Sequence, residues 1–386
     1  MTDRGSPLFP EAPQRHRIHR GLVTERQEHI FTWSAVVVVL LYITAWIYAI
    51  VDINRMRNTP VPVAGGAHEE PAEPPRTPAQ DITREFFGPT APAHPSYLSD
   101  AMLGFLHPLR GESGKLRFAA ALPGSRIVGS APGGVNAVIS GGSSPDFTAP
   151  SQPGIYELAV EANRQRRPIA DLSVITLVPS SMKRGGRIGS YQLGSWPFER
   201  GGVPRTPRYA APKGFIQVTP QNQDFRVSEH FQLKDFLTKD QYGVWPKYVP
   251  LDPLLVDKLE LTIAALQRSG IRVEHVHVMS GFRTPRYNAG GGNTSGRANL
   301  SRHMYGDASD VYVDNNRDGY PDDITGDGRV TVADAERFAR AAEEVERDHR
   351  ALIGGIGVYP ACCGHGPFTH VDVRGFRARW RGSGSG

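Results

Sequence analysis

One uncharged segment near the amino terminus constrains the architecture of this 386-residue chain more than any other feature. Residues 31–51 read FTWSAVVVVLLYITAWIYAIV, without a charged side chain. A helix of about 20 apolar residues spans the hydrocarbon core of a bilayer, and Trp33, Trp46 and Tyr48 suit the membrane interface. The segment predicts one uncleaved membrane-spanning helix, because no small-residue cleavage site of a signal peptide follows it.

Arginines around this segment predict its orientation. Five of them precede it: Arg4, Arg15, Arg17, Arg20 and Arg26. Arg55 and Arg57 follow it closely. Because positively charged flanks stay in the cytoplasm, residues 1–30 are expected to form a cytoplasmic tail. The predicted localisation is a bacterial inner membrane, with a single pass and the main body of the chain on the periplasmic side.

Composition divides the next part of the chain into a linker and a β-rich region. Residues 52–96 are dominated by Pro, Ala and Glu, which cannot form a packed core, so we expect an extended linker. Residues 97–220 contain short alternating apolar runs between Pro, Gly and Ser turns, a pattern typical of a small sandwich. No catalytic constellation is visible there, and the region is predicted to be an accessory β domain.

The charge balance argues against nucleic acid as a partner. The formal net charge is +5, and the basic residues are spread along the chain without a dense Lys/Arg run. The same modest positive charge suits the acidic polymers of a bacterial envelope. No particular protein partner is indicated.

Three residues in the last third of the chain have the spacing and chemistry of a catalytic metal site. His303 and Asp310 lie in SRHMYGDASD, at 301–310, and His370 follows in FTHVD, at 368–372. Two imidazoles and one carboxylate leave the fourth position of a tetrahedral zinc ion open to water, as in catalytic sites. Bound zinc lowers the pKa of that water to about 7 and polarises a peptide carbonyl. The sequence therefore predicts a zinc hydrolase.

The surrounding residues, 221–382, are predicted to form one mixed α and β domain. Apolar residues recur at helical spacing over 253–269, and Gly270 follows as a stop signal. Residues 273–279 alternate as in a strand, and 333–349 are helical in composition.

Four motifs of this region resemble a known family. In chain order they are SGFRTP at 280–285, SRHMYGDASD at 301–310, GIGVYP at 355–360 and FTHVDVR at 368–374. Over roughly residues 225–382 the chain resembles the M15 family of zinc D-Ala-D-Ala carboxypeptidases and related murein endopeptidases. The resemblance implies peptidoglycan as the substrate and the three residues above as the zinc ligands. It also implies that Arg283 binds the substrate and steadies the developing oxyanion.

One position departs from the family pattern. Family members commonly carry an acidic general base three residues before the last ligand, where this chain has Pro367. Asp372 and His365 are the nearest replacements. Residues 370 and 372 of a strand point to the same face, so Asp372 is placed either to act as the base or to orient the imidazole of His370. Both roles stay open.

Arg283, Ser301 and Tyr305 are predicted to contact the substrate. A planar, permanently charged guanidinium can hold a carboxylate by two contacts or stabilise a tetrahedral oxyanion. The alternative for Arg283 is a surface salt bridge. Tyr305 either donates a hydrogen bond to the transition state or packs against its neighbours.

Two further pairs contain metal-ligand residue types. His275 and His277 project to one face of the predicted strand, but with three better ligands available a structural or substrate-facing role is expected. Cys362 and Cys363 are adjacent, and adjacent residues rarely meet ordinary disulfide geometry, so no structural disulfide is predicted. The favoured interpretation is that both cysteines lie in a loop and bind no metal. A role as metal ligands is the less favoured alternative.

An acidic insertion at 314–334 contains two overlapping calcium-loop patterns. The second pattern predicts as ligands Asp323, Thr325, Asp327, Arg329 through its carbonyl, Thr331 and Asp334. The first pattern predicts Asp314, Asn316, Asp318 and Asp322, without a carboxylate at its last position. Because so many acids would repel one another without a cation, Ca²⁺ is predicted as a structural ion beside Zn²⁺. Asp334 in place of the usual Glu resembles dockerin loops, so a partner-binding role is the alternative.

The predicted fold class is α+β. A small antiparallel-sheet zinc peptidase domain with flanking helices follows a transmembrane helix and a β-sandwich-like accessory domain. The expected function is hydrolysis of peptide bonds in peptidoglycan stems or cross-links, as a D,D-carboxypeptidase or an endopeptidase. The alternative, kept open by Pro367, is a catalytically weak peptidoglycan-binding or scaffold protein that retains the metal site.

Overall fold

The computed structural model describes residues 106–127, 136–139, 148–162, 165–204, 206–291, 297–362 and 364–382. All of them belong to the larger of two compact units, Glu73–Gly386. The predicted tail, anchor and linker lie outside the described residues. Within the described part of the chain, no helix is both long and apolar enough to cross a membrane.

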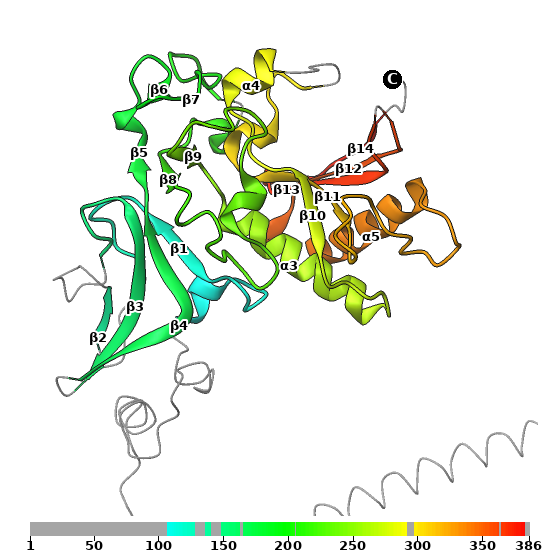
Figure 1. Cartoon of the computed structure of the whole chain (residues 1–386), viewed down its shortest axis with the longest axis horizontal. Helices are drawn as coiled ribbons and strands as arrows, with labels where there is room; N and C mark the ends of the chain where they lie inside the picture. Colours follow the sequence, from blue (N-terminus) through cyan, green and yellow to red (C-terminus); the bar gives the residue numbers. More distant parts are fainter. Residues whose placement is uncertain are drawn as a thin grey trace, which may run out of the picture. The chain divides into compact units, whose positions relative to one another are not determined.

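The strands before residue 177 form one four-stranded sheet (Figure 1). In spatial order they are β1 (Phe118–Ala121), β4 (Gln165–Thr176), β3 (Gly154–Ala162) and β2 (Asn136–Ile139). β1 runs parallel to β4, and the other neighbours are antiparallel. Among the residues described here, this single sheet takes the place of the expected sandwich. Its β1 edge packs against helix α3 (Pro253–Arg268) instead, where Asp257 accepts hydrogen bonds from the backbone of Glu112 and Ser113.

Strands from both sides of residue 220 pair with each other. The sheet β5-β8-β9 joins β8 (Gly214–Val218) to β9 (Lys247–Val249). The other short strands are β5 (Val178–Pro179), β6 (Arg187–Ile188) and β7 (Tyr191–Gln192). Buried apolar side chains form one cluster that extends from Leu116 to Val373. In the described part of the chain, the predicted boundary at residue 220 therefore does not separate two hydrophobic cores.

A five-stranded sheet dominates the C-terminal region. In spatial order it contains β10 (Val276–Ser280), β11 (Ala308–Val313), β13 (Phe368–Asp372), β12 (Gly355–Tyr359) and β14 (Ala378–Arg381). All neighbours are antiparallel except β12 and β14. The α+β class with small antiparallel sheets and few helices is confirmed for the described residues.

Two helices cover one face of this sheet. Helix α3 (Pro253–Arg268) begins after Asp252, whose side chain accepts from the Leu254 N–H at 2.9 Å, and it ends before Gly270 at φ 83°. Helix α5 (Val332–Asp348) contacts α3, β12 and β13. The sequence predicted both helices to within one residue at each end.

The alternation of the strands separates an apolar face from a polar one. Val311 and Val371 are fully buried in the apolar cluster shared with the helices. Their neighbours Asp310, His370 and Asp372 project to the opposite face, because successive side chains of a strand alternate. That opposite face carries the functional residues.

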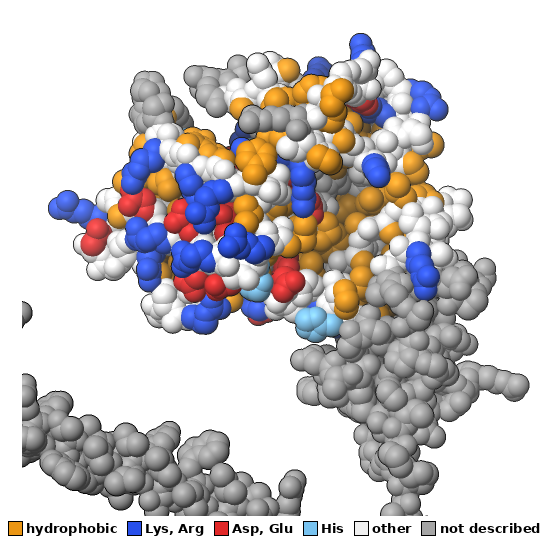
Figure 2. All heavy atoms as spheres, turned by 180° about the vertical axis from the view of Figure 1, so that it is seen from behind, with side chains coloured by type: hydrophobic (Ala, Val, Ile, Leu, Met, Phe, Trp, Pro, Cys, Tyr) orange, Lys and Arg blue, Asp and Glu red, His pale blue; other side chains and the backbone are white. Residues whose placement is uncertain are grey.

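Short helices connect these elements. They are α4 (Pro285–Gly290) and the 3₁₀ turns His107–Arg110, Ser180–Met182, Pro207–Tyr209, Leu233–Phe236, Arg302–Tyr305 and Arg350–Leu352. On the face shown in Figure 2, Lys and Arg side chains are interspersed with Asp and Glu side chains.

Candidate metal centre

His303 is fixed from behind by the SGFRTP loop. It lies in the 3₁₀ turn Arg302–Tyr305, and its Nδ1 is 2.7 Å from the carbonyl oxygen of Gly281. Arg283 N–H donates to the carbonyl of His303 at 3.1 Å. A Cβ at Gly281 would lie 2.6 Å from the Cα of Phe236, so glycine is needed for this close approach. With Nδ1 occupied, the ring directs Nε2 toward the sheet.

Asp310 and His370 meet this nitrogen from neighbouring strands. They are direct cross-strand partners on β11 and β13. His370 Nδ1 lies 2.8 Å from Asp310 Oδ1, and His303 Nε2 lies 3.1 Å from His370 Nδ1 and 3.2 Å from Asp310 Oδ1. Ligand atoms about 2.0–2.2 Å from a tetrahedral metal are roughly 3.3 Å from each other. The three predicted ligands could therefore hold a metal ion together.

Burial and mutual contact set the charges of these residues. Burial, with the Arg283 charge, lowers the pKa of His303 to about 4. Burial opposes ionisation of Asp310, but His303, His370 and Arg283 hold its pKa well below the usual range. The pKa of His370 is raised, since its bonds to Asp310 and Asp372 outweigh burial. A histidine must lose its extra proton before it binds a metal ion, so the raised pKa of His370 means that metal binding is expected to weaken as pH falls.

Arg283 reaches the same site. Its Nη2 donates to Asp310 Oδ2 at 2.8 Å, and its Nε donates to Ser280 Oγ at 3.0 Å. The second carboxylate oxygen of Asp310 is thus occupied by Arg283, which leaves Oδ1 for the metal. Nη1 of Arg283 has no partner among the described residues, and the side chain keeps 17% of its surface exposed.

Asp372 stands behind His370 and is fully enclosed. Its Oδ2 lies 3.1 Å from His370 Nε2. Its Oδ1 accepts from Gly355 N–H at 2.7 Å and from Arg374 Nε at 2.9 Å. These bonds, led by those from His370 and Arg374, outweigh burial and keep the pKa of Asp372 well below its usual range. This geometry favours the orienting role of Asp372 over the role of general base.

Replacing Asp372 with asparagine is expected to weaken zinc binding by about 10–100-fold, because His370 loses the charged partner that orients it. Competition with a chromogenic chelator on the full-length chain measures this affinity. Asp348→Asn, at an exposed position at the end of α5, is the matched control and should bind as the wild type. Unchanged zinc affinity combined with lost hydrolysis would contradict this assignment and make Asp372 the base.

Among the described residues, the contacts of His365, Ser301 and Tyr305 are with residues other than the three predicted ligands. His365 Nδ1 is 2.8 Å from the Gly366 carbonyl oxygen, and its ring packs edge-on against Phe368. Ser301 is buried at the start of the 3₁₀ turn. The ring of Tyr305 contacts Tyr209 and lines a separate cavity of about 230 Å³. For Tyr305 this geometry favours the packing alternative.

Trp380 is a neighbour of the centre that the sequence did not reveal. Its ring centroid is 5.1 Å from that of His370, and its Nε1 donates to the Tyr359 hydroxyl at 2.8 Å. A Cβ at Gly357 would collide with this indole, and one at Gly355 would collide with Asp372. Two glycines in alternation on a strand mark such a close approach. The Gly-x-Gly pattern of β12 is the sequence signal from which a close approach of a large side chain could have been predicted.

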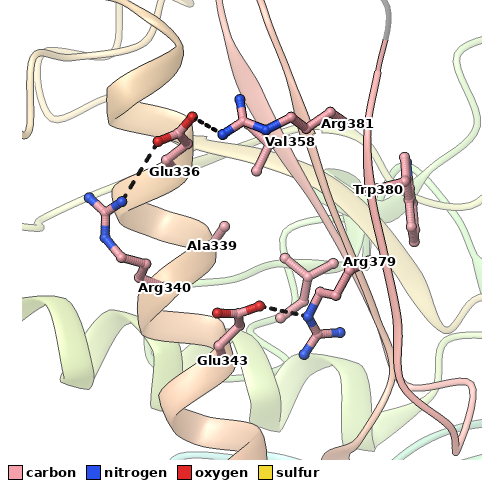
Figure 3. A pocket seen from close by; sticks show the side chains of 9 residues that line it. Glu336, Ala339, Arg340, Glu343, Val358, Arg379, Trp380 and Arg381 are labelled. Carbon is pink, nitrogen blue, oxygen red and sulfur yellow. Dashed lines mark hydrogen bonds and ion pairs between the residues drawn. The ribbon is translucent and has the colours of Figure 1, made fainter. Parts of the chain in front are cut away.

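Ion pairs with α5 position the strand that carries Trp380. A cavity of about 370 Å³ lies between α5 and the strands β12 and β14 (Figure 3). Across it, Arg379 bonds to Glu343 at 2.7 Å, and Arg381 bonds to Glu336 at 2.5 Å. The three metal ligands do not line this cavity.

The insertion is held by carboxylates that accept backbone N–H groups. Asp323 accepts from Gly326 and Gly328, both at 2.7 Å. Asp334 accepts from Thr331 N–H at 2.7 Å and forms a capping box for α5. No three acids of the insertion form a group of converging ligand atoms among the described residues. The calcium ligands remain a prediction.

Two other predictions from the sequence concern the cysteine pair and the histidine pair. Cys362 is disulfide-bonded, so the prediction without a disulfide was wrong, and Cys362 is not available as a thiolate ligand. Cys363, the other cysteine of the chain, lies outside the described residues. His275 and His277 group with Asp314, which the sequence had assigned to a calcium loop.

No family model, no curated protein and no solved structure matches this chain. The family likeness therefore rests on the four sequence motifs. The donor set of two imidazoles and one carboxylate, with a neighbouring guanidinium, stands on the geometry alone.

Proposed function

We propose that this chain is a zinc-dependent hydrolase of amide bonds that acts on peptidoglycan stem peptides or cross-links. The observation that carries the hydrolase is the approach of ligand atoms of His303, Asp310 and His370 to within 3.2 Å of one another. The substrate class is supported by the resemblance of the four motifs to the M15 family. The anchor predicted at residues 31–51 would keep this activity at the periplasmic side of an inner membrane.

The side chains of the centre have distinct tasks in this proposal. Zinc, when bound, supplies a Lewis acid and a water with a pKa of about 7. Asp372 holds the imidazole of His370 in the orientation that presents Nδ1. Arg283 offers its free Nη1 to the carboxylate of a stem peptide or to the oxyanion that forms on the attacked carbonyl.

A second candidate function is a binding or scaffold protein that keeps the metal but hydrolyses slowly. Pro367 stands where an acidic base is expected, and it is buried. Asp372 is occupied by His370, Arg374 and Gly355, and His365 is bonded to the Gly366 carbonyl. Asp372, the one carboxylate among the two candidate bases, is therefore not free to accept the proton of the attacking water.

Digestion of purified murein sacculi tests both candidates. The full-length chain in detergent is incubated with sacculi, with and without a chelator and with zinc added back, and the fragments are identified by mass. We expect loss of a terminal D-Ala or scission of cross-links, abolished by the chelator and restored by zinc. Intact sacculi in the presence of the zinc-loaded chain would reject the hydrolase and favour the binding protein.

A further inference from the structure

A second group of metal-ligand side chains lies on the same face of the five-stranded sheet. His275 directly precedes β10, and His277 lies within that strand. Asp314 directly follows β11. Their ligand atoms all lie within 4.8 Å of one another, and His277 Nδ1 is 3.7 Å from Asp314 Oδ2. That separation is too long for a hydrogen bond, but it is within about half an ångström of the ligand spacing around a tetrahedral metal.

The nitrogens of this group are available. The rings of His275 and His277 make no hydrogen bond to any other part of the described chain. The ring of His277 is stacked on Tyr312, with centroids 4.9 Å apart and an interplanar angle of 14°. Burial lowers the pKa of both histidines. The stacking fixes the direction in which His277 presents its ring nitrogens.

Hydrogen bonds to the neighbouring backbone hold the carboxylate of Asp314 beside the two histidines. Asp314 is 1% exposed, and its two oxygens accept from Asp318 N–H and Gly319 N–H, each at 3.1 Å. Asp314 N–H donates to the carbonyl of His275 at 3.0 Å. Asn315 Oδ1 accepts from His275 N–H at 3.2 Å. Each carboxylate oxygen keeps a lone pair for a further partner. Because these backbone bonds hold the carboxylate beside the histidines, the group is preorganised for a metal ion.

The chemistry of the group selects the ion. Ca²⁺ takes oxygen ligands, whereas two imidazoles and a carboxylate suit Zn²⁺ and neighbouring first-row divalent ions. We propose that His275, His277 and Asp314 form a second transition-metal site, occupied by Zn²⁺ or a similar divalent ion. Asp314 is then a ligand of this ion, in place of its predicted role in a calcium loop.

The second site is separate from the first. Asp310 and Asp314 are four residues apart along one chain direction, which corresponds to about 13 Å of strand. Metals that share a catalytic step lie about 3.5–4 Å apart. The second ion therefore ties the edge strand β10 to the start of the insertion, and it does not depend on the proposed hydrolysis.

Zinc content tests this proposal without an activity assay. The full-length chain is equilibrated with a small excess of Zn²⁺ and separated from free metal, and zinc per chain is measured by elemental mass spectrometry. We expect two ions in the wild type, one in His275→Ala/His277→Ala, one in His303→Ala and none in the triple variant. His107→Ala, which removes an exposed imidazole, is the control and should keep two.

Each result decides the matter. A double variant that retains the wild-type zinc content would overturn the proposal, as would a wild type with one ion that His303→Ala removes. A double variant that loses both ions has lost its fold, and His277→Ala alone then decides, with one ion expected. Failure to digest sacculi would reject the proposed hydrolase but would leave this zinc count unchanged.

Discussion

Replacing His303 with alanine is expected to slow amide hydrolysis by about 1,000-fold or more, since a metal contributes several kcal/mol to the transition state. His303 is buried, and its Nε2 lies within 3.2 Å of both other ligand atoms. Two remaining ligands would not hold a metal ion tightly, so the Lewis acid that the proposed hydrolysis requires would be lost. The measurement is kcat/KM on a stem peptide ending in D-Ala, with zinc content determined in parallel.

His107→Ala provides the control for this experiment because it removes a histidine from an exposed position. It should retain the wild-type rate and zinc content. A His303→Ala variant that hydrolyses at the wild-type rate would show that the centre does not carry the reaction. If His303→Ala loses zinc but the wild type also shows no hydrolysis, the result favours the binding protein.

Replacing Lys258 with alanine is expected to lower the free energy of unfolding by about 3–5 kcal/mol, the usual effect of breaking a buried ion pair. Lys258 of α3 is completely buried. Its Nζ donates to Glu346 Oε1 of α5 at 2.6 Å and to the main-chain carbonyl of Asp372 at 2.8 Å. One ammonium group thus joins both helices to the strand that carries His370. Without it, Glu346 keeps a buried charge with fewer partners.

Urea unfolding of the full-length chain in detergent, followed by tryptophan fluorescence, measures this change. Lys234→Ala is the matched control, because Lys234 pairs with Asp224 at 2.7 Å on the surface. Exposed pairs contribute at most about 1 kcal/mol. If Lys258→Ala does not fold, Lys258→Met keeps most of the aliphatic stem and still removes the charge. Equal stability of the Lys258 and Lys234 variants would be inconsistent with a joining role.

The group of residues that could hold a metal ion was predictable because the chemistry of its members is visible in short stretches of sequence. His303 and Asp310 belong to one short motif, and His370 lies in a strand-like run. The structure places Asp310 and His370 directly opposite each other, which is a property of strand register. Helices α3 and α5 were equally predictable, since their caps and apolar spacing are local signals.

The residues around the ligands could not be assigned in the same way. The sequence left Asp372 between two roles, and the contacts of its oxygens with Gly355 and Arg374 favour the orienting role. Trp380 reaches His370 only because β14 pairs with β12. His275 and Asp314 lie far apart in the sequence and become neighbours through the pairing of β10 with β11.

The sequence by itself determined which residues form the buried group that could hold a metal ion, the mixed α and β class and the positions of the two main helices. It did so because capping, periodicity and ligand chemistry depend on residues close together in the chain. The tertiary structure alone decided which side chains surround the ligands, that the core continues across residue 220, and that Lys258 joins both helices to β13. These features depend on contacts between distant segments, and register and burial fix such contacts only when the whole domain packs.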